Sequence, residues 1–287
     1  MKKFDYHRPQ TLKEAFRLME KYKGRACYIA GGTDILVRVR KGAMEPDALV
    51  SLRGINELKG YERDGGVSFG SMTLIRELEK DPFFSSAFPA LSQAAAVVAS
   101  PQIRNVATIG GNLGNAAPSA DCAPPLLTLE AELTLEGPGG KREVPLEQFF
   151  QGPGRTCRDP LEIITRITIP PLPEKTGMAF LKNGRVNQDI ALTNAAALLV
   201  MEKGVCRKCR LAVGAVAPVP LRLKETESLL EGQTIDEDLL ARVGEKVEQE
   251  IRPISDVRTS EEYRRVVTGV MVVRAIRFAK ELSVSGC

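Results

Sequence analysis

The sequence predicts a protein of two domains that mixes helices and strands, and three observations support this. The chain has 287 residues, of which 43% are hydrophobic and 26% charged, as expected of a globular protein longer than one typical domain. Short apolar runs alternate with helical patterns over most of the chain. A proline cluster at 170–173 then precedes a β-hairpin pattern and two long helical patterns.

The first elements are a helix and a strand. Residues 11–14, Thr-Leu-Lys-Glu, form a capping-box pattern, in which the hydroxyl and the carboxylate satisfy free backbone N–H groups. Apolar residues then recur at helical spacing until Gly24, which favours the end of a helix. Residues 26–30 form a short apolar run before Gly31 and Gly32, so we expect a buried strand there.

Further elements follow from their local patterns. The expected strands before the proline cluster are 49–52, 67–70, 131–135 and 163–169. The expected helices are 83–99, which is rich in alanine, and 123–129, whose prolines suit a first helical turn.

The hairpin after the proline cluster consists of 191–201 and 205–217, joined at Lys203-Gly204. Helices are expected at about 236–251 and 260–282. Along one face of the second helix lie Val266, Val270, Val273 and Ile276.

Composition excludes several function classes. The net charge of +4 is mild, and no basic stripe interleaved with aromatic residues suggests nucleic acid. A single histidine, His7, leaves almost no material for a Ser-His-Asp triad or a histidine metal site. We see neither an apolar run of roughly 20 residues nor a secretory signal. We therefore expect a cytoplasmic protein with reduced cysteines.

Cys206 and Cys209 form half of a metal-site pattern. In a strand, residues three apart point to opposite faces, so we expect no metal there.

Two glycine-rich segments suggest a ligand site. Residues 29–36 and 107–121 each follow an apolar run, and backbone without side chains can approach a ligand and direct N–H groups at anionic oxygens. Two alternatives stay open: a plain turn at Gly110-Gly111, and a helix start capped by Thr33 or Asp34. Asp121 could contact a ligand or cap the following helix.

The chain resembles the FAD-binding, or medium, subunit of the molybdenum hydroxylases, the group of xanthine dehydrogenase, carbon monoxide dehydrogenase and 4-hydroxybenzoyl-CoA reductase. The residues that carry this resemblance are 30–34 (Ala-Gly-Gly-Thr-Asp), 102–112 with Asp121, 189–191 (Asp-Ile-Ala), 214–220, 256–258 (Asp-Val-Arg) and 263–265 (Tyr-Arg-Arg).

The resemblance implies an α+β fold. A two-subdomain FAD-binding region of the vanillyl-alcohol-oxidase (PCMH) type would occupy 1–173, with subdomains of about 1–55 and 56–173. A smaller α+β domain, like the C-terminal domain of the carbon monoxide dehydrogenase flavoprotein, would occupy 174–287.

The resemblance also implies cofactor-binding residues and no catalytic or metal-ligating residue. Two loops would hold the FAD pyrophosphate: Ile29, Ala30, Gly31, Gly32, Thr33, Asp34, Ile35 and Leu36, and Thr108, Ile109, Gly110, Gly111 and Asn112. Asp121 matches an acidic FAD contact, Ile164 and Lys182 match positions close to the cofactor, and Phe180 and Ile190 match positions near the isoalloxazine ring.

The implied function is an FAD-dependent electron-transfer subunit. It would take electrons from the [2Fe-2S] clusters of a small partner subunit and deliver them to an acceptor, NAD, with ferredoxin, quinone and oxygen as alternatives. A large partner subunit would carry molybdopterin, and the complex would be a dimer of heterotrimers. The competing hypotheses are a self-contained flavin-dependent oxidoreductase and a non-catalytic nucleotide-binding module.

Residues 184–188 depart from the family pattern, because relatives often carry two consecutive arginines where this loop has one, Arg185. The chain also lacks the cysteine-rich insertion of the benzoyl-CoA reductase type.

Overall fold

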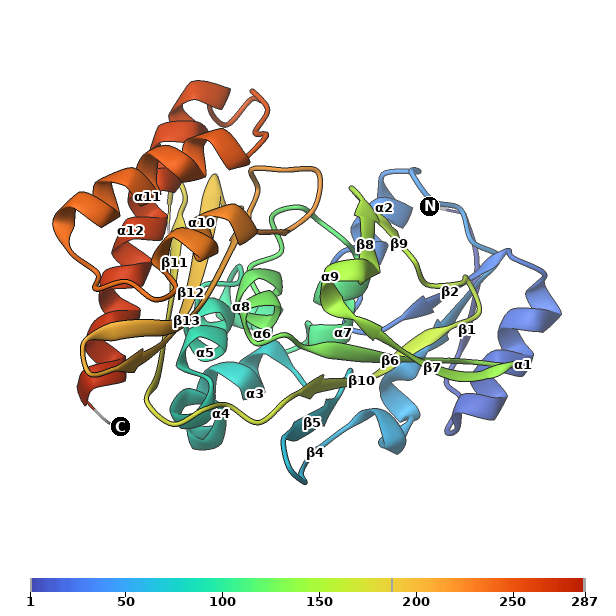
Figure 1. The fold of residues 1–287 in the computed structure, drawn as a ribbon. Coiled ribbons are helices and arrows are strands. Elements are labelled where there is room, and N and C mark those ends of the chain that lie inside the picture. Colours follow the sequence, from blue (N-terminus) through green and yellow to red (C-terminus); the bar gives the residue numbers. More distant parts are fainter. Residues whose placement is uncertain (1, 187, 286–287) are drawn as a thin grey trace.

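The computed structural model describes residues 2–186 and 188–285, and every later structural statement concerns these residues. They form three principal sheets with helices packed around them (Figure 1). None of the helices in these ranges is both long and apolar enough to cross a membrane.

The first sheet is parallel, in the order β1 (Asp5–His7), β3 (Ala48–Ser51), β2 (Ala26–Ile29). Around it lie α1 (Leu12–Tyr22), α2 (Ile35–Arg40) and two 3₁₀ turns, Leu52–Gly54 and Asn56–Leu58. The predicted cap of α1 is confirmed, since Thr11 Oγ1 accepts the N–H of Glu14 at 3.2 Å. The Glu14 carboxylate bonds the N–H of Gln10 at 2.8 Å, one residue before the expected partner.

The second sheet is antiparallel, in the order β4-β5-β10-β6-β7. Its strands are β4 (Tyr61–Arg63), β5 (Val67–Gly70), β10 (Ile163–Ile169), β6 (Glu132–Gly137) and β7 (Gly140–Pro145). The short pair β8 (Phe150–Gly152) and β9 (Arg155–Thr156) lies between β7 and β10 along the chain. The strand expected at 163–169 therefore lies at the centre of this sheet.

Seven short helices lie between β5 and β8 along the chain: α3 (Ile75–Lys80), α4 (Pro82–Ala87), α5 (Pro89–Ala96), α6 (Pro101–Arg104), α7 (Ile109–Gly114), α8 (Ala123–Thr128) and α9 (Leu146–Phe149). The single helix expected at 83–99 is wrong. The chain breaks at Phe88, because the residue before a proline disfavours helical backbone angles, and Pro89 starts α5.

The third sheet is antiparallel, in the order β11 (Thr176–Asn183), β12 (Thr193–Glu202), β13 (Val205–Gly214), β14 (Leu221–Arg222). It is followed by α10 (Lys224–Leu230), α11 (Glu237–Glu250) and α12 (Glu261–Ser285). The hairpin and both long helices predicted from the sequence are confirmed. Together with the first two sheets, they confirm the predicted α+β class.

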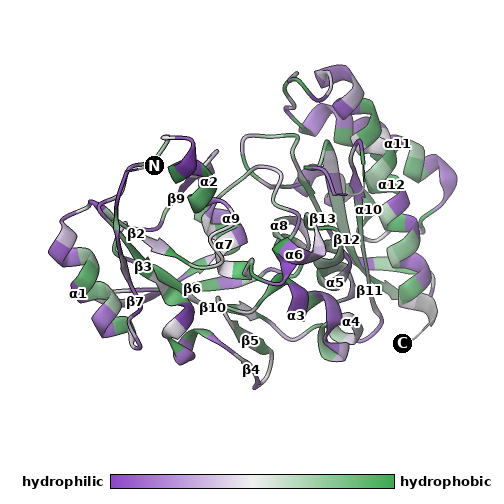
Figure 2. Cartoon of the chain, turned by 180° about the vertical axis from the view of Figure 1, so that it is seen from behind, coloured by the Kyte–Doolittle hydropathy of each residue, from purple (hydrophilic) through white to green (hydrophobic). Residues whose placement is uncertain are grey.

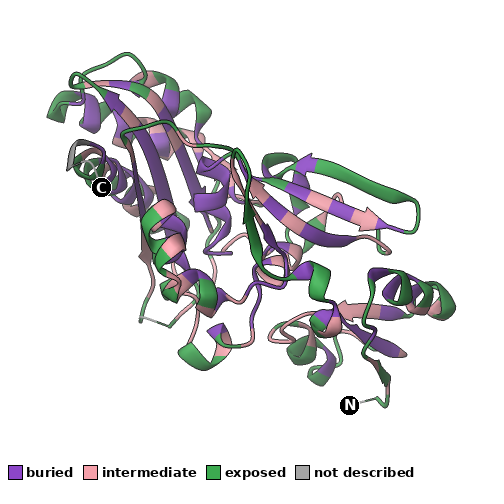
Figure 3. Cartoon of the chain, turned by 90° about the horizontal axis from the view of Figure 1, so that it is seen from below, coloured by how far each residue is buried: buried purple, intermediate pink, exposed green. Residues whose placement is uncertain are grey.

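Both faces of this third sheet are covered, which explains the nearly continuous apolar run of β12 (Figures 2 and 3). Ala195, Ala197 and Leu199 pack in one cluster with α11 and α12. Ala196 and Leu198 belong to the other cluster, which includes residues of α5 and α8. The sheet therefore joins the C-terminal helices to the preceding part of the chain in one packed body.

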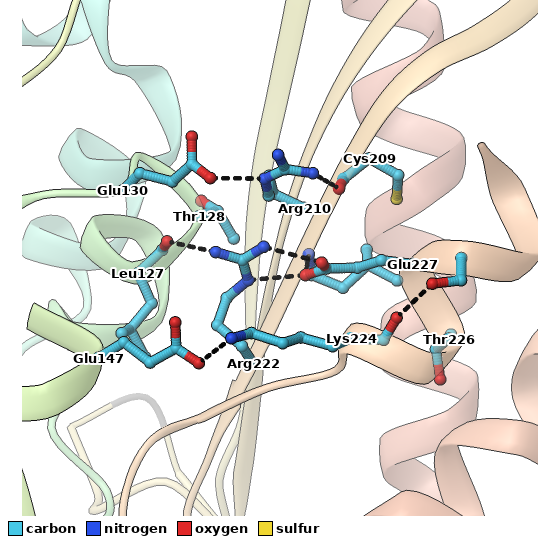
Figure 4. Close-up of polar contacts among 12 residues, drawn as sticks. Leu127, Thr128, Glu130, Glu147, Cys209, Arg210, Arg222, Lys224, Thr226 and Glu227 are labelled. Carbon is cyan, nitrogen blue, oxygen red and sulfur yellow. Dashed lines mark hydrogen bonds and ion pairs between the residues drawn. The ribbon is translucent and has the colours of Figure 1, made fainter. Parts of the chain in front are cut away.

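Polar contacts reinforce this junction (Figure 4). The Arg222 guanidinium forms two bonds of 2.7 Å with the Glu227 carboxylate, and its Nη1 donates to the carbonyl of Leu127 in α8. Glu130 and Arg210 form a further pair at 2.9 Å. Both Arg222 and Glu227 have side chains that are 7% exposed, so this link is protected from solvent.

The prediction of a buried apolar face on α12 is only partly correct. Val266 and Val270 are 56% and 44% exposed, whereas Ile276 is buried. The buried residues of α12 also include Met271, Val272, Ala275 and Ala279, which pack against the third sheet.

Cys206 and Cys209 lie on the same face of β13, contrary to expectation. Met201 pairs with Cys206 and Val200 with Lys208, so Arg207 is an extra residue, a β-bulge. The bulge shifts the alternation and buries both thiols. No cluster of three or more potential metal ligands exists in the described chain.

Candidate functional site

A cleft of about 950 Å³ lies where the first sheet, the central helices and the third sheet meet. Fourteen of the eighteen site residues predicted from the sequence line it: Ala30, Gly31, Gly32, Thr33, Asp34, Ile35, Thr108, Gly110, Gly111, Asn112, Asp121, Ile164, Lys182 and Ile190. The fold thus gathers residues from four distant parts of the chain. Four predicted residues lie outside the lining: Ile29, Leu36, Ile109 and Phe180.

The first glycine loop joins β2 to α2. Gly32 has φ +81°, a backbone conformation that side chains disfavour. A Cβ on Gly31 would overlap the carbonyl oxygen of Val106 and lie 2.8 Å from Ala107 Cα. Glycine is therefore required here because the two glycine-rich segments approach each other at backbone distance.

The N–H groups of residues 31–35 donate to no protein acceptor within the described ranges. Neither Thr33 nor Asp34 caps α2 with its side chain. The capped-helix alternative for this loop is therefore not realised. These donors remain available to a ligand, and an anion is their natural partner.

The second glycine loop opens α7 and uses its donors internally. Thr108 Oγ1 accepts the N–H of Gly111 at 3.1 Å, while the N–H groups of Ile109 and Gly110 bond Thr73 and Ser71. Asn112 differs, because its Oδ1 is buried and has no hydrogen-bond partner. An unpaired buried acceptor is costly, so this atom is suited to a ligand donor.

The side chain of Asn115 ties the second glycine loop to the first loop and to α2. Asn115 Nδ2 donates to Asp34 Oδ1 at 3.1 Å, and Asn115 Oδ1 accepts from Arg38 Nη2 at 2.9 Å. Arg38 and Asn115 also line the cleft. These contacts fix the separation of the loops and hence the width of the cleft between them.

Asp121 forms a buried ion pair with Lys182, with 2.7 Å between Oδ2 and Nζ. Its other oxygen accepts from Asn194 Nδ2 at 2.9 Å, and Lys182 also donates to the carbonyl of Val97. Burial raises the pKa of the Asp121 carboxyl above its ordinary value, and the Lys182 ammonium opposes that shift. The helix-cap alternative is wrong, since the N-cap of α8 is Cys122 and no side chain caps it.

The apolar residues divide between the wall, the mouth and the core. Ile164 is 6% exposed and lies in the wall, whereas Ile190 is 54% exposed. Phe180 is buried in the core, and its N–H donates to Gln93 Oε1 at 2.8 Å. Phe180 therefore presents no face to the cleft.

Sequence reasoning missed four further residues that line the cleft: Cys27, Tyr28, Arg158 and Glu162. Arg158 Nη1 donates to the carbonyl of Glu162 at 2.6 Å, and burial lowers the Arg158 pKa. Cys27 and Tyr28 belong to β2, whereas Arg158 and Glu162 lie between β9 and β10, so no single local motif predicts the group.

The cleft fits an anionic dinucleotide. Such a ligand engages the groups that this cleft offers. They are unused N–H donors, a loop whose glycine leaves no room for a side chain, an unpaired buried amide oxygen and apolar wall residues. The fold and the cleft therefore define a protein that binds a nucleotide cofactor.

Comparisons with known proteins identify the cofactor class. Residues 2–172 match the FAD binding domain in molybdopterin dehydrogenase, and residues 178–279 match the CO dehydrogenase flavoprotein C-terminal domain. A putative xanthine dehydrogenase FAD-binding subunit of Escherichia coli strain K12 is 36% identical over 94% of both chains. The carbon monoxide dehydrogenase medium chain of Afipia carboxidovorans is 34% identical over 96% of both.

Solved structures agree with these relatives. A chain of carbon monoxide dehydrogenase from Hydrogenophaga pseudoflava superposes with a TM-score of 0.95, at 30% identity and with 98% of both chains covered. A chain of quinoline 2-oxidoreductase from Pseudomonas putida 86 gives a TM-score of 0.93, at 30% identity and with 99% of both covered. The present chain belongs to the FAD-binding, or medium, subunits of the molybdenum hydroxylase family, which are oxidoreductase subunits.

Proposed function

We propose that this chain holds FAD in the cleft and serves as the electron-transfer subunit of a multi-subunit molybdenum hydroxylase. The observation that carries this proposal is the free set of N–H donors at residues 31–35, packed against the backbone of 106–107. A diphosphate placed there would receive several backbone hydrogen bonds. The bound flavin would supply the redox chemistry, namely hydride and single-electron transfer.

The role of the chain's own residues would be to bind the cofactor and to orient it. The N–H groups of residues 31–35 would hold the pyrophosphate, and the side chain of Asn112 would accept from a ribityl or ribose hydroxyl. The Lys182–Asp121 pair gives the inner wall a fixed polar arrangement, while Ile164 and Ile190 would contact apolar parts of the cofactor. Phe180 supports this wall from the core.

Electrons enter and leave through partners. The cleft lining within the described ranges contains no histidine, and its Cys27 thiol has a pKa raised by burial. The match of both parts of the chain to medium subunits of multi-subunit dehydrogenases favours a relay over a self-contained oxidase. We infer that a small subunit with [2Fe-2S] clusters supplies the electrons, that a large molybdopterin subunit performs the hydroxylation, and that two such heterotrimers associate. NAD is the proposed acceptor.

This function is tested by co-expressing the protein with the products of its neighbouring genes and purifying it. We expect yellow protein that releases FAD, identified by mass, and that copurifies with a molybdopterin subunit and an iron–sulfur subunit. Reduction of the complex, followed by mixing with NAD, ferredoxin, a quinone or oxygen, identifies the acceptor by the rate of flavin reoxidation. Colourless protein that cannot be reconstituted with FAD would overturn the proposal. Flavin-dependent turnover of a substrate by the isolated chain would favour a self-contained enzyme.

A further inference from the structure

Arg53 lies behind the first glycine loop, on the side away from the cleft. It belongs to the 3₁₀ turn Leu52–Gly54, which directly follows β3. Strand β3 is parallel to β2, with Ser51 opposite Ile29, so the two chain segments leave the sheet side by side. This topology places Arg53 next to the loop although more than twenty residues separate them in sequence.

The Arg53 guanidinium binds two consecutive carbonyl groups of that loop. Its Nε donates to the Ala30 oxygen at 3.3 Å, and its Nη2 donates to the Gly31 oxygen at 3.2 Å. The guanidinium is planar, so its two donors form a fixed fork that holds both peptide groups at once. The Arg53 N–H in turn donates to Ser51 Oγ at 3.4 Å, which ties the turn to the end of β3.

The orientation of these carbonyls determines where the N–H groups point. In a trans peptide, the C=O of one residue and the N–H of the next point in opposite directions. No peptide bond in the described chain is cis. Because the carbonyls of Ala30 and Gly31 point at Arg53, the N–H groups of Gly31 and Gly32 point away from it. Ala30, Gly31 and Gly32 all line the cleft, and Arg53 does not.

We propose that Arg53 is a positioning residue for the anion-binding donors of the cleft. It holds the two peptide groups in one orientation, so that the N–H groups of Gly31 and Gly32 are presented to the ligand before it binds. Glycine has more accessible backbone conformations than other residues, and ordering these peptide groups on binding would oppose it. The inference rests on the proposed function, because it concerns the donors that would hold the FAD pyrophosphate.

The positive charge of Arg53 acts in the same direction, since a cation behind the peptide groups favours an anion in front of them. Lysine retains this charge but lacks the planar fork. Charge and geometry can therefore be separated by comparing Arg53→Lys with Arg53→Met.

The test measures FAD affinity, apoprotein stability and the ³¹P resonances of bound FAD, in wild type, Arg53→Met, Arg53→Lys and the control Arg17→Met. Arg17 is an exposed residue of α1 outside the cleft lining. We expect Arg53→Met to weaken FAD binding by about tenfold or more, as for the loss of charged hydrogen bonds. Arg53→Lys should recover part of this loss, and Arg17→Met should behave as wild type.

Two readouts separate positioning from a structural role. The thermal midpoint of the apoprotein should stay near that of wild type in Arg53→Met, whereas the stabilisation by added FAD should shrink. At saturating FAD, the pyrophosphate ³¹P shifts should move while the flavin absorption spectrum stays the same. Wild-type affinity in Arg53→Met, or an equal loss of apoprotein stability and affinity, would overturn the inference. If wild-type protein itself takes up no FAD, the proposed function fails first and this inference fails with it.

Discussion

Lys182 Nζ lies 2.7 Å from Asp121 Oδ2, and this pair links β11 to the turn that precedes α8. The two side chains are 7% and 8% exposed, and Asn194 of β12 bonds the second carboxylate oxygen. This ion pair therefore belongs both to the wall of the cleft and to the junction between the second and third sheets. Its disruption should affect both the fold and the cofactor.

Replacement of Lys182 by methionine should strongly destabilise the protein. The variant leaves the Asp121 carboxylate buried without its cation, and breaking a buried pair from one side costs about 3–5 kcal/mol. Urea denaturation of the apoprotein gives this free energy. The double variant Lys182→Met/Asp121→Asn should recover much of the loss, because it removes the unpaired charge.

The matched control for this pair is Lys13→Met, at an exposed position of α1, which should change little. Equal stability of Lys182→Met and wild type would show that the pair contributes nothing net to folding.

Substitution of Gly111 by valine should abolish flavin retention. A Cβ at Gly111 would lie 3.0 Å from Thr108 Oγ1, the acceptor that caps α7, and 3.7 Å from Ala30 of the facing loop. The branched methyl groups would enter the space between the loops. The flavin-to-protein ratio after purification measures the effect.

Gly139→Val is the control for that substitution, because a Cβ at Gly139 meets nothing within 4 Å. Stoichiometric flavin in Gly111→Val would mean that the cofactor does not lie in the space between the two glycine-rich loops.

Local patterns predicted the elements that form the cleft, because glycine pairs, caps and strand alternation act over a few residues. The loop of Gly31 and the hairpin of β12 and β13 are of this kind. The partners of Asp121 could not be predicted in the same way, since Lys182 and Asn194 are 61 and 73 residues away in sequence and meet only in the folded chain.

The errors have local physical causes as well. Alternation in β13 was broken by one extra residue, Arg207, and no sequence signal marks a bulge at that position. The outward face of α12 carries Val266 and Val270, which periodicity alone assigns to a core. Both cases show that register, and not composition, decides which side of an element is buried.

Acidification should remove a contribution to stability that comes from Glu162. Two hydrogen bonds from Arg142, at 2.7 and 2.8 Å, hold the pKa of this carboxyl below its ordinary value of 4.5. A lowered carboxyl pKa contributes stability above the unfolded value, and this is lost as the pH falls through the folded value. We expect this interaction to contribute about 1–2 kcal/mol to the free energy of unfolding. The contribution should be lost as the pH falls below about 4.5.

Urea denaturation of wild type and Glu162→Gln between pH 7 and pH 3 measures this contribution. The two curves should differ at neutral pH and converge in acid. Glu132→Gln, at an exposed position of β6, should follow wild type throughout. A constant difference across the range would assign the Glu162 effect to packing instead of ionisation.

Asn112→Ala should separate ligand affinity from stability. In the protein alone, Asn112 Oδ1 is buried without a donor, so its removal relieves a desolvation cost and should leave the apoprotein as stable as wild type or more so. In the proposed complex with FAD, that oxygen would accept from a hydroxyl group of the cofactor, so the variant should bind FAD about tenfold more weakly. Asn105→Ala, at an exposed position, is the control. Paired calorimetric measurements of unfolding and FAD binding decide the matter. A variant that lost stability while retaining affinity would show that Asn112 serves the fold and leaves the ligand untouched.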